Sequence, residues 1–108
     1  MSVQHQELAS GRWDQMTTFE QMANIGSEVE RAIQWKEKNN PLRFEKAFDR
    51  ALELLDLSLD SPRNKNVLRE IARTREVLVD FFSSEHQYQI STVQLRKYFL
   101  QFALLARK

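Results

Sequence analysis

The sequence predicts an all-α protein, an antiparallel (up-down-up-down) four-helix bundle. Apolar residues recur at three- and four-residue spacing along four long segments, which is the pattern of amphipathic helices. Only 2 Gly and 2 Pro occur in 108 residues, fewer turn residues than an all-β chain of this length would need. No segment shows the strict alternation of a half-buried strand. The length fits one domain, and 42% apolar residues distinguish the chain from a disordered one.

We expect a flexible N-terminal tail over residues 1–12, because this stretch is polar and has no helical periodicity. Residues 13–108 are expected to form a single four-helix domain. Trp13, at its start, either packs into the core or covers one end of the bundle or a second subunit. The predicted helices lie at about 18–39, 41–59, 62–83 and 92–107.

The first two helices have clear start signals. Thr17 or Thr18 can cap the first helix, since a Glu or Gln follows three residues later, as a capping box requires. Asn40 is a good cap for the second helix, and Pro41 fits its first turn. The apolar faces of the two helices are Phe19, Met22, Ala23, Val29, Ala32 and Ile33, and then Phe44, Ala47, Phe48, Ala51, Leu54 and Leu55.

The last two helices follow similar signals. Ser61–Pro62 repeats the helix-start signal of Asn40–Pro41, with a capping residue followed by proline. Ser91 or Thr92 can cap the fourth helix. The third helix has the apolar face Leu68, Ile71, Ala72, Leu78, Val79 and Phe82, and the fourth has Val93, Leu95, Tyr98, Phe99, Phe102, Leu105 and Ala106. Short connections place consecutive helices next to each other in opposite directions.

Both late helices are apolar over more than one stripe. Phe81 joins Phe82, and Leu100, Ala103 and Leu104 widen the apolar face of the fourth helix. A surface helix in a monomer needs one apolar stripe, so the extra width indicates a second buried contact. We therefore expect a homo-oligomer, with a further protein partner as an alternative.

Several kinds of chemistry have no support in the sequence. The chain has no Cys, which excludes disulfides and thiolate metal sites. His5 lies in the predicted tail and His86 in a polar link, and neither has the spacing of a metal or catalytic motif. We expect no catalytic, cofactor-binding or metal residues, no cofactor and no enzymatic activity.

The expected cellular location is inferred from the length of the apolar runs and from the composition of the first twenty residues. No apolar run approaches the roughly 20 residues that span a bilayer. The first twenty residues lack the basic start and apolar core of a signal peptide. The expected location is cytoplasmic, without contact to a membrane.

Arg75 is the one charged residue at a position where the third helix should present an apolar side chain. It falls within the heptad-like series Leu68, Ile71, Leu78 and Phe82. A buried guanidinium is costly unless it meets a carboxylate. Glu28 and Asp56 have a comparable place beside apolar residues, so we predict a buried ion pair among these three, with a ligand or RNA contact as the alternative.

Positive charge gathers in the second part of the chain. Residues 1–60 hold 7 basic and 11 acidic side chains, whereas residues 61–108 hold 9 basic and 4 acidic ones. Clustered cations can bind phosphate groups, and a solvated helix face or a contact between oppositely charged halves explains the same pattern. The candidate anion- or RNA-binding residues are Arg63, Lys65, Arg69, Arg73, Arg96 and Lys97.

Two stretches resemble a small family of microbial four-helix-bundle proteins. These are NIGSEVERAIQWKEK (24–38) and AFDRALELLDLSLDSPRNK (47–65), and REVLVDFF and KYFLQFALLAR look similar too. The resemblance implies a helical bundle, but this family has no established activity and gives no site to carry over. In layout alone, the chain is also similar to the rRNA intervening-sequence proteins and to the accessory proteins of diversity-generating retroelements, which are basic, oligomeric four-helix bundles associated with RNA.

Two functional hypotheses follow. The first is a non-enzymatic, oligomeric helical interaction or scaffold protein, based on the extra apolar faces. The alternative is an RNA- or nucleoprotein-binding accessory bundle that uses a basic face on the third and fourth helices.

Overall fold

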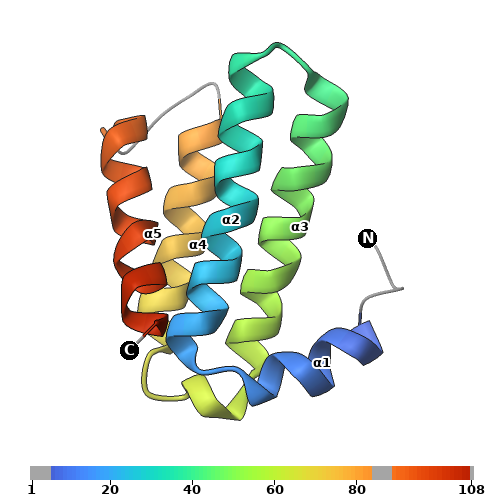
Figure 1. Cartoon of the computed structure of the whole chain (residues 1–108), viewed down its shortest axis with the longest axis vertical. Helices are drawn as coiled ribbons and strands as arrows, with labels where there is room; N and C mark the ends of the chain where they lie inside the picture. The colour runs from blue at the N-terminus through green and yellow to red at the C-terminus, as the bar shows by residue number, and fades with distance from the viewer. Residues whose placement is uncertain (1–5, 84–88, 108) are drawn as a thin grey trace.

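The computed structural model describes residues 6–83 and 89–107. Within these residues it contains helices and no strand, which confirms the all-α prediction. The elements, in chain order, are α1 (Gln6–Gln15), α2 (Thr18–Glu37), α3 (Pro41–Asp60), the short 3-10 helix η1 (Pro62–Asn64), α4 (Leu68–Phe82) and α5 (Thr92–Ala106) (Figure 1).

Helix α2 has the central place in the arrangement. Figure 1 shows α2 and α3 side by side, joined at the top of the view by the turn of residues 38–40. Helix α5 packs against α2 on the side away from α3, and α4 packs against α3. The short helices α1 and η1 both lie at the lower end of the view, near the start of α2 and the end of α3 (Figure 1).

The predicted caps of three long helices, α2, α3 and α5, are present. Thr17 and Glu20 form a reciprocal capping box at the start of α2. The Asn40 side chain accepts a hydrogen bond from the Arg43 backbone N–H, and Pro41 occupies the first turn of α3. Asn39 has a φ of 55°, the left-handed conformation that commonly ends a helix, so α2 stops two residues before its predicted end at 39.

The N-terminal prediction is wrong where the structure describes it, because residues 6–12 belong to α1 rather than to a flexible tail. Residues 1–5 of the expected tail lie outside the described residues. Trp13 makes a buried contact that helps to hold α1, since its indole Nε1 donates to Ser58 Oγ at 2.9 Å. One side chain gives no periodic signal, so the apolar pattern could not indicate this helix.

The third predicted helix also begins late, at Leu68 rather than at residue 62. Residues 62–64 form η1, and its last residue, Asn64, turns a fully buried side chain into the protein. The Asn64 amide donates to the Ser58 carbonyl oxygen at 2.9 Å and to Gln21 Oε1 at 2.6 Å. Because these bonds hold the chain at the end of α3, α4 starts only after a further turn.

These contacts belong to a buried hydrogen-bond network at one end of the molecule. The Gln21 amide donates to the Trp13 carbonyl oxygen at 2.8 Å, and Thr18 Oγ1 donates to Asn64 Oδ1. Gln21, Ser58 and Asn64 are fully buried. Buried polar groups are tolerated when they are hydrogen-bonded, so this network joins α1, α2, α3 and η1 at a fixed geometry.

The apolar core lies between the long helices. Its α2 members face both α3 and α5, as expected for the central helix. The buried apolar residues are Trp13, Met22, Ile25, Val29, Ala32, Ile33, Ala47, Ala51, Leu55, Ile71, Leu78, Phe82, Leu95 and Phe99.

Replacing Asn64 by Ala tests the network. The substitution leaves Gln21 Oε1 and the Ser58 carbonyl oxygen without this donor, and each buried polar group without a partner costs about 1–3 kcal/mol. We expect the free energy of unfolding, measured by urea denaturation, to fall by about 2 kcal/mol or more.

The matched control is Asn66→Ala, since Asn66 is exposed in the turn after η1. That variant should remain within about 0.5 kcal/mol of the wild type. Equal stabilities for the two variants would show that the network does not contribute as described.

Candidate interaction surface

The described residues lack two of the side-chain types that most often bind metals. They include neither His nor Cys, since His5 and His86 lie outside them. Within residues 6–83 and 89–107, no group of three or more acidic side chains is placed to hold a metal ion. None of the helices in this part of the chain has the length and apolar character needed to cross a membrane.

The predicted ion pair is present in part, but it is not buried. Arg75 Nε donates to Asp56 Oδ1 at 2.9 Å, and the two side chains are 37% and 56% exposed. The prediction of a buried pair is therefore wrong. Arg75 lies at the edge of the contact between α4 and α3, where water still reaches the guanidinium. Exposed pairs contribute about 0–1 kcal/mol to stability.

Glu28, the third member of the predicted cluster, does not meet Arg75. Its nearly buried carboxylate pairs with Arg31, one turn along α2, and lies 3.9 Å from Arg50 Nε on α3. It therefore belongs to the contact between α2 and α3. The sequence indicated that Glu28 needs a partner but assigned the wrong cation.

Arg96, a member of the predicted basic face, forms an ion pair instead. The Arg96 guanidinium donates from Nε and Nη2 to the two carboxylate oxygens of Glu30, at 2.8 and 2.9 Å. This contact lowers the pKa of Glu30 below its ordinary value, chiefly through the hydrogen bond from Arg96. Arg96 thus joins α5 to α2 rather than extending a basic face on α4.

The other five candidate residues are exposed but not all alike. Arg63 Nε donates to the Asp14 carbonyl oxygen at 3.2 Å, which ties it to the end of α1. Lys65, Arg69 and Arg73 follow one another at four-residue spacing through the start of α4, and Lys97 lies apart on α5. Among the six residues, Arg96 is thus paired with Glu30 and Arg63 bonds the backbone of α1. RNA binding stays a prediction.

Helix α5 exposes an apolar stripe. Val93, Leu100 and Leu104 are 61%, 56% and 55% exposed, and their spacing of seven and four residues puts them on one helix face. We call these three residues the α5 stripe. Leu95 and Phe99, on another face, are buried against α2, so α5 is apolar on both its inner and its outer side.

A groove lies between α2 and α5, next to this stripe. Its volume is about 470 Å³, and we call it the α2–α5 groove. Small side chains from both helices contribute to it, together with Leu100 from the stripe itself. Its lining residues are Ala23, Gly26, Ser27, Val29, Glu30, Arg31, Ile33, Gln34, Leu95, Arg96, Phe99, Leu100 and Ala103.

Gly26 sets the distance between the two helices. A Cβ atom at this position would lie 2.8 Å from Phe99 Cβ, closer than side chains approach in folded proteins. Because Gly in a helix interior costs about 1 kcal/mol relative to Ala, its presence there indicates a close approach by another element. The sequence places Gly26 on the apolar stripe of α2, but it does not say which helix approaches.

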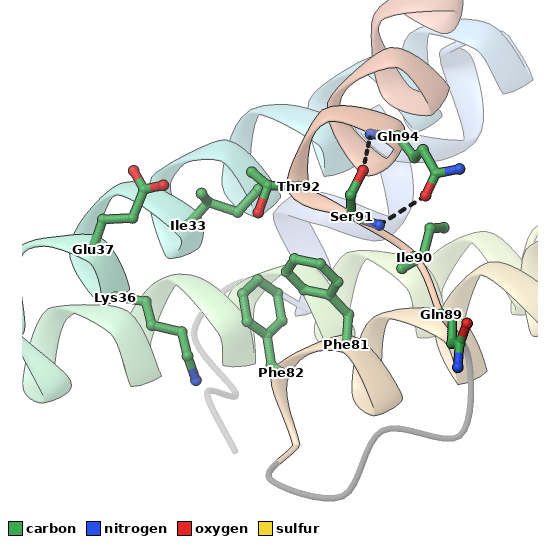
Figure 2. A pocket seen from close by; sticks show the side chains of 10 residues that line it. All are labelled: Ile33, Lys36, Glu37, Phe81, Phe82, Gln89, Ile90, Ser91, Thr92 and Gln94. Carbon is green, nitrogen blue, oxygen red and sulfur yellow. Dashed lines mark hydrogen bonds between the residues drawn. The ribbon is translucent and has the colours of Figure 1, made fainter.

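A second hollow, of about 790 Å³, lies where the C-terminal ends of α2 and α4 meet the start of α5 (Figure 2). Its apolar walls include Phe81 and Phe82, whose ring centroids are 5.0 Å apart. Ser91 and Gln94 form a capping box at its rim, drawn as dashed lines in Figure 2. This capping box occupies two backbone N–H groups at the start of α5. These groups are therefore not free to bind an anion.

Tyr98 connects α5 with α4 on a third side. Its hydroxyl donates to Glu70 Oε1 at 2.8 Å and lies 2.7 Å from Thr74 Oγ1. Burial, supported by the neighbouring Glu70 carboxylate, raises the pKa of Tyr98 to about 12. The phenol therefore stays protonated in the folded protein over a wider pH range than an exposed tyrosine.

Comparison with protein-family models, with curated proteins and with solved structures finds no match to this chain. The resemblance to small microbial four-helix proteins therefore stays a prediction. Helix α5 with its neighbouring groove is the candidate site that the geometry itself defines.

Replacing Gly26 by Ala tests the close contact with Phe99. Overpacking a core costs about 1–3 kcal/mol, whereas Ala gains about 1 kcal/mol in helix propensity over Gly. Since the clash involves a Cβ atom fixed to the α5 backbone, we expect a net loss of stability in urea denaturation. Gly11→Ala is the matched control, because nothing lies within 4 Å of a Cβ there. A Gly26→Ala variant that gains stability as Gly11→Ala does would contradict the contact.

The raised pKa of Tyr98 predicts a loss of stability at alkaline pH. The folded state holds the phenol proton more tightly than the unfolded state, in which a tyrosine ionises near pH 10. The contribution of Tyr98 is therefore fully present below about pH 10 and is lost as the pH rises through about 12.

The measurement is an absorbance titration of the Tyr88→Phe variant, in which Tyr98 is the single phenol. Far-ultraviolet circular dichroism recorded in parallel reports whether the helices persist. Ionisation near pH 10 in a chain that is still helical would sink this prediction.

Proposed function

We propose that this protein is a non-enzymatic helical interaction module that associates with itself, built as an up-down-up-down four-helix bundle. The proposal rests on the α5 stripe, a row of large apolar side chains on the outer face of a helix whose inner face already packs on α2. The short connection between α2 and α3 and the opposite directions of these neighbours support the bundle topology.

Exposed apolar residues are common when they occur singly, but three on one helix face are a different case. A helix that covers a core needs one apolar stripe, and contiguous exposed apolar area marks interaction sites. The α5 stripe also lies beside the α2–α5 groove, so the same side of the molecule offers both projecting and receding apolar surface.

The RNA-binding alternative has less support. It rests on Lys65, Arg69 and Arg73, whereas Arg96, the intended link to α5, is held by Glu30. Aromatic side chains for base stacking are not interleaved with these cations.

Sedimentation velocity over a range of concentrations tests the proposed function. We expect the wild-type chain to sediment as an oligomer at micromolar concentration. The double substitution Leu100→Glu with Leu104→Glu should give a monomer of unchanged helicity, because a buried carboxylate without a partner opposes association. Leu42→Glu is the matched control, since Leu42 is exposed near the start of α3, away from α5. A wild-type chain that remains monomeric at all concentrations would refute self-association.

A further inference from the structure

We infer that the α2–α5 groove receives α5 of a second copy, while the first copy's α5 enters the groove of its partner. Leu100 and Leu104 are the residues that insert, and Gly26, Ser27 and Ala103 form the receiving surface. The interface is then a two-fold, isologous one. This inference rests on the proposed self-association and names the surface and the symmetry that would carry it.

The first support is shape. Leu100 lines the groove and is itself 56% exposed, and Leu104 follows one turn later. A surface that carries a projecting row directly beside a receding one is complementary to a copy of itself turned by a two-fold rotation. Small residues on the groove floor allow a second helix to approach to the usual interaxial distance of about 8–10 Å.

The second support is charge. The charged side chains that line the groove are already paired within one copy, Arg96 with Glu30 and Arg31 with Glu28. A nucleic acid or an anionic lipid surface binds through cations that exchange small counterions, and here it would compete with fixed carboxylates. The groove lining therefore carries no unpaired charge and suits the apolar side chains of Leu100 and Leu104 from a second copy.

Lys97 is compatible with this packing. It lies between Val93 and Leu100 along the outer face of α5 and is exposed. The aliphatic part of a lysine side chain can cover apolar surface while its ammonium group stays in water. Lys97 can therefore lie within the contact between two copies without an acidic residue beside its ammonium group.

Filling the groove tests the receiving surface without changing the stripe. Ser27→Trp places a bulky side chain on the groove floor, at an exposed position that donates only to the Ala23 carbonyl oxygen. We expect the apparent Kd for association to rise about tenfold or more. Asp49→Trp, on the exposed face of α3, is the matched control and should associate like the wild type.

A single introduced cysteine tests the symmetry, because the natural chain has none. Ala103 lines the α2–α5 groove on the side of α5 that faces the partner, so a two-fold contact between α5 helices brings the two copies of residue 103 near each other. A short bismaleimide should then link Ala103→Cys into covalent dimers and nothing larger. Asp49→Cys should stay uncrosslinked at the same protein concentration.

The outcomes separate this inference from the proposed function. A monomeric wild type would overturn both. An oligomeric wild type in which Ser27→Trp still associates normally, or in which Ala103→Cys gives no crosslinked dimer, would overturn the inference and leave self-association standing. If Ser27→Trp keeps its assembly but loses binding to a single-stranded RNA oligonucleotide, the groove receives a polyanion and the inference is likewise overturned.

Discussion

The Asn64 side chain is the point at which four elements of this fold meet. Its amide bonds Gln21 on α2 and the Ser58 carbonyl at the end of α3, its oxygen accepts from Thr18, and Ser58 in turn accepts from Trp13 on α1. A buried amide has directional partners, whereas apolar packing tolerates small rotations and shifts. The network therefore fixes where α3 ends and where α4 begins, and that start determines how α4 packs along α3.

The parts of the fold that sequence reasoning predicted are those with a periodic or local signal. Helical spacing located four long helices, and Thr17, Asn40 and Ser91 marked three starts, because a cap acts within three residues of itself. Helix α1 depends instead on Trp13, and the late start of α4 depends on Asn64. Each of these residues bonds a side chain more than forty residues away in the sequence. Such contacts have no period, so the sequence pattern could not reveal them.

The candidate site follows the same division. The extra apolar width of the fourth helix was visible in Leu100 and Leu104, since exposed and buried faces are read from spacing alone. The ion pairs were not visible in the sequence, because they depend on which helices are neighbours. Arg96 is near other cations in the sequence but faces Glu30 across the contact between α5 and α2, and Glu28 meets Arg50 on α3 rather than Arg75 on α4. The sequence indicated that Glu28 needs a partner but assigned Arg96 to a basic face, and the packing order of the helices determines the partner of each.

That packing order makes the outer surface of α5 depend on its inner one. Gly26 lets α5 approach α2 closely through Phe99, and two hydrogen bonds between Arg96 and Glu30 join the same two helices. Because the side chains of a helix are fixed relative to one another, burying Leu95 and Phe99 against α2 directs Leu100 and Leu104 outward. The same close approach leaves small residues to line the α2–α5 groove beside them. The exposed stripe and the groove are therefore both consequences of how tightly α5 packs on α2, and a change to that internal contact would alter both together.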